Sequence, residues 1–300
     1  MSKAAFVALV GRPSVGKSTL INLLCGAKVA IVSTIPQTTR NIIRGILTRE
    51  EGQLVFVDTP GRHVSEKKYN KKLMEMADRA LNESELVLYV LDASRPPGLE
   101  EIAVTERIKW YQERTVAAIN KCDAPGADPA QLRAFLQEQL PDLPASRCFE
   151  ISCHQKEGIE PLLACLYEMS PESEAPYPAE YYTDQDMNFR VSEIIREKAM
   201  ERLKQELPHS IYVETADLEL KNDPATGNQR LWVRAFIITE RESQKGMIVG
   251  KGGEKIKAIG QAARKELNRI FEWKVDLDLR VKTGKDWRQN DHLLRKITSQ

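Results

Sequence analysis

The stretch at residues 11–18 has the residue types needed to hold a phosphate group. It reads G-R-P-S-V-G-K-S, the G-x-x-x-x-G-K-S pattern of a phosphate-binding loop. Its two glycines let the backbone curl until N–H groups point at phosphate oxygens, and the helix beginning at Lys17 adds its positive dipole end. We expect Lys17 to bridge the β- and γ-phosphates of a nucleotide and the Ser18 hydroxyl to ligate Mg²⁺. The predicted contacts in this stretch are Gly11, Ser14, Val15, Gly16, Lys17, Ser18 and Thr19.

A second motif, D-T-P-G at residues 58–61, follows a predicted strand at residues 53–57. In this position Asp58 is expected to hold Mg²⁺ through water, and the Gly61 N–H to bond the γ-phosphate. A D-x-P-G sequence is also typical of an ordinary turn. The interpretation as a γ-phosphate motif therefore depends on its position after a phosphate-binding loop.

Between these motifs lies Q-T-T-R, at residues 37–40, in a polar loop. A threonine in such a loop ligates Mg²⁺ only while the γ-phosphate is present, which makes the loop a switch between the nucleoside triphosphate and diphosphate states. We favour Thr39, and Thr38 is the alternative. The predicted catalytic residues are Lys17, Thr39 and Gly61, and the predicted metal ligands are Ser18, Thr39 and Asp58.

A third motif, N-K-C-D at residues 120–123, indicates selection of guanine. A carboxylate at Asp123 accepts hydrogen bonds from guanine N1–H and the exocyclic amine, and adenine would leave it unpaired. Asn120 is expected to tether the base to the phosphate loop, and the Lys121 stem to pack on the base. Ser152 and Cys153, after the last predicted strand, place a backbone N–H near guanine O6. A redox role for Cys153 is the alternative, which no nearby partner supports.

The elements that must position these motifs alternate between strands and helices. This alternation predicts an α/β fold with a mainly parallel sheet covered by helices on both faces, in a GTPase domain at residues 1–170. The predicted strands are at residues 4–10, 42–48, 53–57, 86–91, 115–119 and 147–151, and the helices at 17–24, 67–82, 100–112, 129–140 and 159–169.

A segment rich in proline and glutamate predicts a linker at residues 171–186 and a second domain at residues 187–300. The second domain has a different, α+β pattern. Its predicted elements are a long helix at 188–206, strands at 210–220 and 231–239, short helices around a glycine-rich segment near 250, a strand at 275–283 and a polar, basic tail.

Charge and cysteine content narrow the possible environments. The chain of 300 residues has a net charge of +1, but residues 241–300 hold 15 Lys and Arg against 8 Asp and Glu. This basic part predicts a polyanion partner, either a nucleic acid or an anionic membrane surface. The five cysteines form no C-x-x-C pair, so we expect neither a disulfide framework nor a zinc site. No apolar run reaches membrane-spanning length and the start lacks a signal-peptide pattern, so the expected location is cytoplasmic.

With these motifs in this order, the whole chain resembles the Era family of bacterial GTPases, which carry a C-terminal KH domain. The resemblance includes G-R-P-S-V-G-K-S, P-Q-T-T-R, D-T-P-G and N-K-C-D. It also includes M-I-V-G-K-G-G-E-K-I-K-A-I at residues 247–259, which is similar to the KH core and implies the type II topology. In that core a G-x-x-G turn presses against RNA and lysines add affinity for the backbone. The implied RNA-binding residues are Gly250, Lys251, Gly252, Gly253, Lys255 and Lys257.

The resemblance also implies partners and cofactors. The implied cofactors are GTP or GDP with Mg²⁺, which act as a switch. The implied partners are the 3′ end of 16S rRNA and the small (30S) ribosomal subunit, in whose maturation the family takes part. Peripheral contact with the inner membrane is also implied, and no DNA partner is expected. Ser14 replaces the asparagine of many relatives, which leaves potassium assistance open, and neither Arg62 nor His63 is an obvious residue for positioning water. Two alternatives stay open: an RNA-binding assembly factor with a structural nucleotide, and a membrane-associated GTPase whose basic domain contacts lipid or protein.

Overall fold

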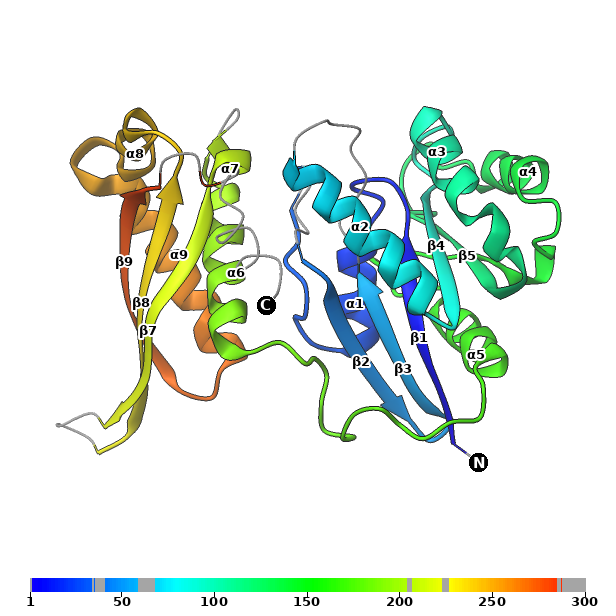
Figure 1. The fold of residues 1–300 in the computed structure, drawn as a ribbon, viewed down its shortest axis with the longest axis horizontal. Helices are drawn as coiled ribbons and strands as arrows, with labels where there is room; N and C mark the ends of the chain where they lie inside the picture. Colours follow the sequence, from blue (N-terminus) through cyan, green and yellow to red (C-terminus); the bar gives the residue numbers. More distant parts are fainter. Residues whose placement is uncertain are drawn as a thin grey trace. The chain divides into compact units, whose positions relative to one another are not determined.

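The structure is a computed structural model, and it describes residues 2–33, 35, 41–58, 68–203, 207–222, 227–284 and 287, without the side chains of residues 68–73 and 209. The chain divides into two compact units, Met1–Asp184 and Gln185–Gln300 (Figure 1). The predictions for Thr38, Thr39, Gly61, Arg62 and His63 lie outside the described residues.

The first unit is built on a six-stranded sheet in which β2 alone, among the described strands, is antiparallel to its neighbour. This confirms the predicted mainly parallel sheet, and β2 and β3 form an antiparallel hairpin. The strands in spatial order are β2 (Ile43–Arg49), β3 (Gly52–Asp58), β1 (Lys3–Val10), β4 (Leu86–Asp92), β5 (Thr115–Asn120) and β6 (Cys148–Glu150).

Helices cover both faces of this sheet, with α2 on the near face in Figure 1 and α1 behind it. Side chains of α2, α3 and α4 pack into one buried cluster with alternate residues of β1, β4 and β5, as expected for strands whose side chains alternate between faces. The helices are α1 (Lys17–Cys25), α2 (Lys68–Glu83), α3 (Leu99–Ile108), α4 (Pro129–Gln139) and α5 (Ile159–Met169).

The end predicted for the helix at residues 100–112 is wrong. Helix α3 stops at Ile108, and a 3-10 segment, η1 (Lys109–Arg114), follows it. Tyr111 has a non-helical φ of −119°, and the Thr115 hydroxyl donates to its carbonyl at 2.6 Å. This local turn directs the chain into β5. A second 3-10 segment, η2 (Ala145–Arg147), precedes β6.

The parallel arrangement brings the predicted motifs to one edge of the sheet. Strands β1, β3, β4 and β5 share one direction, so the residues at their carboxyl ends lie at the same edge. The glycine-rich loop follows β1, Asp58 ends β3, Asp92 ends β4 and Asn120 ends β5. The fold therefore assembles at this edge the residues on which the nucleotide prediction depends.

Residues 171–184, predicted as part of the linker, lie along the hairpin of the first unit. The Gln53 side chain is fully buried and exchanges two hydrogen bonds of 2.9 Å with the Tyr177 backbone. The Ile46 N–H donates to the Tyr182 carbonyl at 3.0 Å, and the Thr183 hydroxyl to the Arg44 carbonyl at 2.8 Å. This segment, residues 171–184, is therefore fastened to β2 and β3.

The second unit is α+β, with the strand order β7-β8-β9. Strand β8 is antiparallel to β7 and parallel to β9. The helix predicted at residues 188–206 ends earlier, at Met200, and the second helix of the glycine-rich region is long rather than short. The elements are α6 (Met187–Met200), α7 (Leu207–Ser210), β7 (Tyr212–Asn222), β8 (Gln229–Thr239), α8 (Glu242–Val249), η3 (Lys251–Gly253), α9 (Glu254–Ile270) and β9 (Lys274–Thr283).

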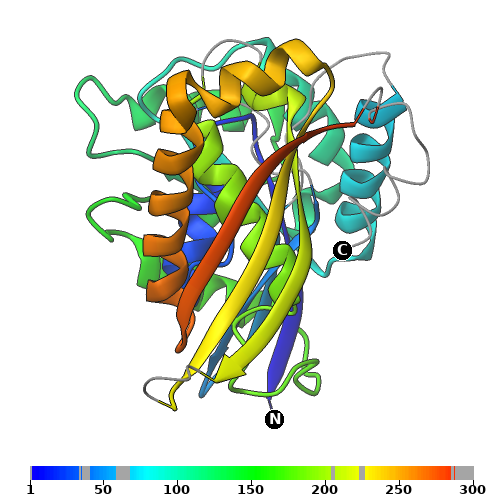
Figure 2. The ribbon, with the colours of Figure 1, turned by 90° about the vertical axis from the view of Figure 1, so that its left-hand side faces the viewer.

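Helices α6 and α9 cover one face of this sheet, and Figure 2 shows the three strands in front of them. Leu231, Val233 and Val275 face the helices in a buried cluster. The opposite face carries cross-strand ion pairs, such as the two 2.6 Å hydrogen bonds from Arg230 to Asp276. The sheet therefore has one apolar face and one charged face, the usual pattern for a half-covered sheet.

The segment after β9, predicted only as a polar tail, contributes a core residue. Trp287 is fully buried. Its ring centroid lies 4.9 Å from that of Tyr212, and its indole N–H donates to the Ser210 carbonyl at 3.2 Å. The sequence pattern missed this anchor because a single tryptophan among polar residues shows no periodicity.

No described helix is long and apolar enough to cross a bilayer.

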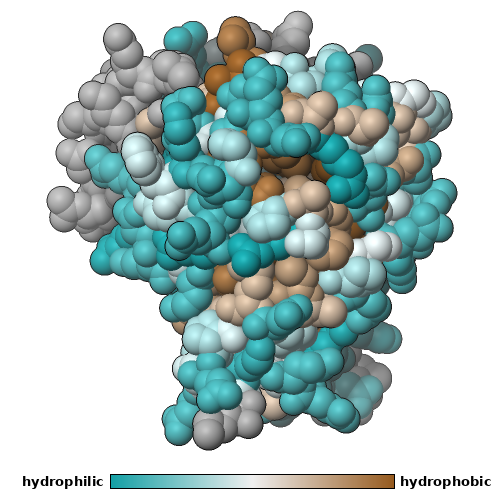
Figure 3. Space-filling view, turned by 90° about the vertical axis from the view of Figure 1, so that its right-hand side faces the viewer, coloured by the Kyte–Doolittle hydropathy of each residue, from teal (hydrophilic) through white to brown (hydrophobic). Residues whose placement is uncertain are grey.

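Figure 3 shows the face of the first unit that carries α3 and α4, where hydrophilic residues predominate and hydrophobic residues form smaller patches. Leu99, Ile102 and Trp110 are exposed large hydrophobic residues of α3 and η1.

Candidate nucleotide-binding and RNA-binding sites

The glycine-rich loop has a backbone shape that requires its glycines. Gly11 has φ +151°, and a Cβ there would lie 2.4 Å from the Val90 carbonyl oxygen. Gly16 has φ +104°, and a Cβ there would lie 2.4 Å from the Asn120 amide nitrogen. Ser14 also adopts a left-handed conformation, with φ +64°. The loop thus curls tightly against the ends of β4 and β5, a shape in which successive N–H groups can face an anion.

Lys17 lies inside this loop and is 8% exposed. Its Nζ donates to the Gly11 carbonyl at 2.8 Å and to the Arg12 carbonyl at 3.0 Å. Burial lowers its pKa, and the nearby Asp58 carboxylate opposes that shift. A cation buried in this way gains strongly from an anionic ligand, because phosphate oxygens replace the lost hydration.

The side chains of Ser18 and Asp58 meet at the mouth of the loop. The Ser18 hydroxyl donates to Asp58 Oδ2 at 2.9 Å, so two oxygen donors from α1 and β3 lie side by side, and Asp58 is fully buried. Oxygen donors of this kind fit Mg²⁺, which prefers a few protein oxygens together with phosphate and water. The predicted partners Thr39 and Gly61 fall outside the described residues.

Asn120 connects the phosphate loop to the segment after β6. It is buried; its Nδ2 donates to the Val15 carbonyl at 2.8 Å, and its Oδ1 accepts from the Cys153 N–H at 3.2 Å. Asp123 follows in the same turn, with a side chain 17% exposed and His154 Nδ1 3.8 Å away. One amide thus fixes both loops beside the Asp123 carboxylate.

Ser152 and Cys153 lie next to Asn120, in the segment that follows β6. Ser152 is buried, and its hydroxyl accepts from the Gln155 N–H at 2.9 Å. Burial raises the pKa of the Cys153 thiol to about 12, so the thiol is protonated at neutral pH and is a poor nucleophile. The geometry therefore favours a backbone role for Cys153 over a redox role.

Asp92 is a site residue that the sequence reasoning missed. Lys121 Nζ donates to Asp92 Oδ2 at 2.7 Å and to the Ser14 carbonyl at 2.8 Å. Burial opposes ionisation of Asp92, but hydrogen bonds from Lys121 and Ser94 outweigh it and lower its pKa. Asp92 therefore fixes the lysine of the base motif. A carboxylate at the carboxyl end of a central parallel strand was the available signal.

Arg12, at a variable position of the loop motif, is the second residue that was missed. Its guanidinium pairs with Glu101 and lies 3.7 Å from Asp92. Glu101 also accepts from the Gly98 N–H at 2.9 Å, which caps α3. The phosphate loop is thereby tied to the start of α3 by an ion pair whose members are largely buried.

The predicted RNA-binding turn lies between α8 and α9 in the second unit. Gly250, Gly252 and Gly253 have φ of +74°, +61° and +81°, conformations that favour glycine. A Cβ at Gly250 would also lie 2.9 Å from Lys255 Cγ. Around the turn, the side chains of Lys251, Lys255 and Lys257 are exposed. The turn thus combines a close-approach backbone with cations, as phosphate contact requires.

Comparison with known proteins identifies the family of each domain. Residues 6–121 match the family model of the 50S ribosome-binding GTPase, and residues 206–288 match the KH domain. GTPase Era of Treponema denticola is 47% identical over 292 residues, which cover 97% of this chain and 98% of that protein. The chain belongs to the Era family of GTPases. GTPase Era of Borreliella burgdorferi (strain ZS7) is 45% identical over 295 residues, covering 98% and 99% of the two chains.

Two solved structures are similar over 98% of both chains. One is an Era variant of Aquifex aeolicus bound to GDP·AlF4⁻, with a TM-score of 0.90 and 33% identity. The other is Era in complex with MgGDPNP and nucleotides 1506–1542 of 16S ribosomal RNA, with a TM-score of 0.90 and 32% identity. The chain is a GTPase with a P-loop GTPase domain followed by a KH domain, as predicted.

Proposed function

We propose that this GTPase is a switch in which GTP hydrolysis controls binding of the 3′ end of 16S rRNA by the KH domain, during maturation of the small ribosomal subunit. In this proposal the chain acts in the cytoplasm, and any contact with the inner membrane is peripheral. One observation carries the proposal: a single chain combines the nucleotide site with a G-x-x-G turn, and over 98% of its length it is similar to Era solved with MgGDPNP and 16S rRNA.

In the proposed nucleotide site, Asp123 accepts from guanine N1–H and the exocyclic amine, and Asn120 and Lys121 hold the base against the phosphate loop. Lys17 bridges the β- and γ-phosphates. Ser18 and Asp58 hold Mg²⁺, which neutralises charge that develops on the phosphates. The Ser18–Asp58 distance of 2.9 Å supports a shared ligand for these two oxygens.

The described part of the site stabilises charge but offers no base to activate water. The Lys17 cation and the N–H groups of the glycine-rich loop are aimed at the phosphates before reaction, so they lower the barrier without reorganisation. In the proposal, Thr39 ligates Mg²⁺ and the Gly61 N–H bonds the γ-phosphate only while GTP is bound. We expect slow hydrolysis by the isolated chain, because the sequence after Gly61 offers no obvious side chain for positioning water and the preorganised electrostatics would act alone.

The experiment that tests this function is crosslinking of the full chain to total cellular RNA with a GTP analogue and with GDP. The control is Gly252→Asp, because a side chain and a negative charge at φ +61° would disrupt the turn and repel phosphate. We expect reads at the 3′ end of 16S rRNA that depend on the nucleotide and are lost in Gly252→Asp. Diffuse reads that ignore both nucleotide and substitution would contradict the proposal.

A further inference from the structure

The phosphate loop contains a strained residue, Ser14. Its φ of +64° is a left-handed conformation that residues with a side chain rarely adopt, and that persists only where the surroundings enforce it. Ser14 is exposed, so packing of its side chain does not enforce this conformation. The restraint acts on its backbone instead, because the Ser14 carbonyl accepts from Lys121 Nζ at 2.8 Å.

Asp92 holds the lysine that makes this contact. Lys121 Nζ donates to Asp92 Oδ2 at 2.7 Å, and this bond fixes an ammonium group that otherwise moves on a flexible four-carbon stem. The other oxygen, Asp92 Oδ1, accepts from the Ser94 N–H at 3.0 Å and from the Ser94 hydroxyl at 2.6 Å. These two bonds fix the carboxylate, so Asp92 presents Oδ2 to Lys121.

The same carboxylate oxygen lies near a second cation of the loop. Arg12 Nη2 is 3.7 Å from Asp92 Oδ2, and Arg12 Nε pairs with Glu101 of α3. Asp92 therefore restrains the loop at two residues, at Arg12 through its side chain and at Ser14 through the carbonyl that Lys121 binds.

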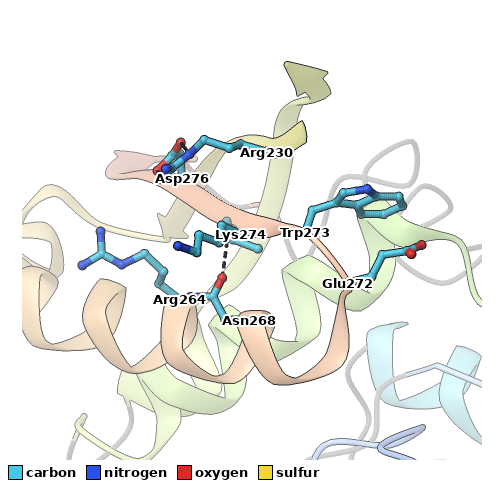
Figure 4. Close-up of a pocket in the computed structure, with 8 residues that line it drawn as sticks. Arg230, Arg264, Asn268, Glu272, Trp273, Lys274 and Asp276 are labelled. Atoms are coloured by element: carbon cyan, nitrogen blue, oxygen red, sulfur yellow. Dashed lines mark hydrogen bonds and ion pairs between the residues drawn. The ribbon is translucent and has the colours of Figure 1, made fainter. Parts of the chain in front are cut away.

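Burial distinguishes this network from a surface ion pair. The side chain of Asp92 is 2% exposed and that of Arg12 is 11% exposed. By contrast, Arg230 and Asp276 of the second unit (Figure 4) have side chains 33% and 37% exposed, and water weakens the attraction in such pairs. Loss of the Asp92 charge would leave a largely buried cation with one carboxylate fewer, which is strongly unfavourable.

We propose that Asp92 is a positioning residue for nucleotide binding: through Lys121 it holds the Ser14 backbone in its left-handed conformation and keeps the phosphate loop in the shape that binds the β-phosphate. The proposal rests on the proposed nucleotide site and adds a residue outside its motifs. In this role Asp92 acts on the fraction of molecules whose loop is ready to bind. A fall in that fraction weakens binding of GDP and GTP by the same factor.

The test measures the affinities of the full chain for GDP and for a GTP analogue with Mg²⁺, together with kcat and KM for GTP. The variant is Asp92→Asn, which keeps the size of the side chain and removes its charge. The matched control is Glu85→Gln, which makes the same change just before the amino end of the same strand, where Glu85 accepts from the Phe6 N–H at 2.7 Å. Urea unfolding without nucleotide measures the stability of each variant.

We expect Asp92→Asn to bind GDP and the GTP analogue about tenfold more weakly than the control does, with the same factor for both. KM for GTP should rise by a similar factor, whereas kcat should change less than about threefold, since bound nucleotide itself holds the loop in shape. Asp92→Glu, which keeps the carboxylate, should recover most of the affinity. Ser94→Ala is a milder change that removes one hydrogen bond to Asp92, and it should weaken binding of both nucleotides about threefold.

The variant Ser14→Gly separates this role from a merely structural one. Glycine adopts positive φ at no steric cost, so the loop of Ser14→Gly should depend less on Asp92. In the Ser14→Gly background, Asp92→Asn should weaken GDP binding by less than about threefold, against about tenfold in the wild-type background. If Asp92 only stabilised the fold, the loss would be the same in both backgrounds.

Four results would overturn this inference. Affinities of Asp92→Asn and Ser94→Ala within about twofold of the control would show that Asp92 does not prepare the loop. Equal losses in the two backgrounds would remove Ser14 from the mechanism. Weaker binding of the GTP analogue with unchanged GDP affinity would assign Asp92 to the γ-phosphate. Wild-type protein that binds neither nucleotide would refute the proposed nucleotide site, and the inference would fail with it.

Discussion

At the scale of single residues, the proposed site assigns the choice of base to Asp123. We expect Asp123→Asn to weaken GTP binding by about 10² to 10⁴-fold, because two hydrogen bonds to a charged group, worth about 1.5–3 kcal/mol each, are lost. Xanthosine triphosphate should bind the variant better than GTP does, since its ring presents the complementary pattern. Titration calorimetry with both nucleotides measures this. Unchanged GTP affinity would remove Asp123 from the base site.

Lys17 should show opposite effects on nucleotide binding and on stability. Lys17→Met removes the phosphate contact, so GTP turnover should vanish. The folded-state pKa of Lys17 lies below 10.5, so its buried charge destabilises the nucleotide-free protein at neutral pH. That penalty fades as pH rises from the lowered pKa toward 10.5, where the unfolded chain also loses its proton.

Thermal melts of nucleotide-free wild type and Lys17→Met between neutral and alkaline pH measure this effect. The variant should melt at or above the wild-type temperature near neutral pH, and the difference should shrink as pH rises. A variant that melts well below wild type at neutral pH would show that the two carbonyl hydrogen bonds of Lys17 outweigh its desolvation.

Sequence motifs predict some of the site residues and miss others. The motifs predict Lys17, Asn120 and Asp123 as nucleotide contacts because their residue types and spacing are typical of a nucleotide site. They do not reveal Asp92 or Arg12, because the partners of these two residues depend on how β4 and α3 meet the loop. Contacts between residues distant in sequence appear only once the sheet order is known.

At the scale of elements, Gln53 fastens residues 171–184 to the hairpin. Gln53→Ala removes both hydrogen bonds to Tyr177 and should lower the free energy of unfolding of the first unit by about 2 kcal/mol, because buried backbone groups lose their partners. Urea unfolding measures this change, and limited proteolysis should cleave residues 171–184 faster. The matched control is Arg49→Ala, which breaks the exposed ion pair with Glu160 at a cost below about 1 kcal/mol. Equal cleavage of the two variants would contradict this role.

Trp287 is the second element-scale anchor, because it attaches the end of the described chain to α7 and β7. Trp287→Ala should destabilise the second unit by about 3–5 kcal/mol, the usual cost of removing a buried aromatic side chain. Trp287→Phe keeps most of the packing but loses the bond to Ser210 and should cost less. Urea unfolding of both variants measures the difference, and an unchanged midpoint for Trp287→Ala would show that this tail is not part of the core.

Element types follow well from the sequence in this chain, whereas some element ends do not. Short runs of apolar residues predict the central strands, which are buried along their whole length, and the parallel sheet follows from the strand–helix order. The end of α3 and the position of Trp287 depend on single contacts, Thr115 with Tyr111 and Trp287 with Ser210. Such contacts leave no periodic signal.

At the scale of the whole molecule, the proposed switch requires the two sites to influence each other. No sequence pattern shows which nucleotide favours RNA binding, since that preference is a difference in free energy between two states of the chain. Coupling between sites is reciprocal, so RNA must change the affinity for nucleotide by the same factor as nucleotide changes the affinity for RNA.

The most direct test measures the dissociation constant of the 16S rRNA 3′ end for the full chain with a GTP analogue and with GDP, at one salt concentration. For a switch, we expect RNA affinities that differ at least about fivefold between the two states. We also expect RNA to change the ratio of the analogue affinity to the GDP affinity by the same factor. Equal RNA affinities in the two states would contradict the switch, and would leave a GTPase whose KH domain binds RNA independently of the nucleotide.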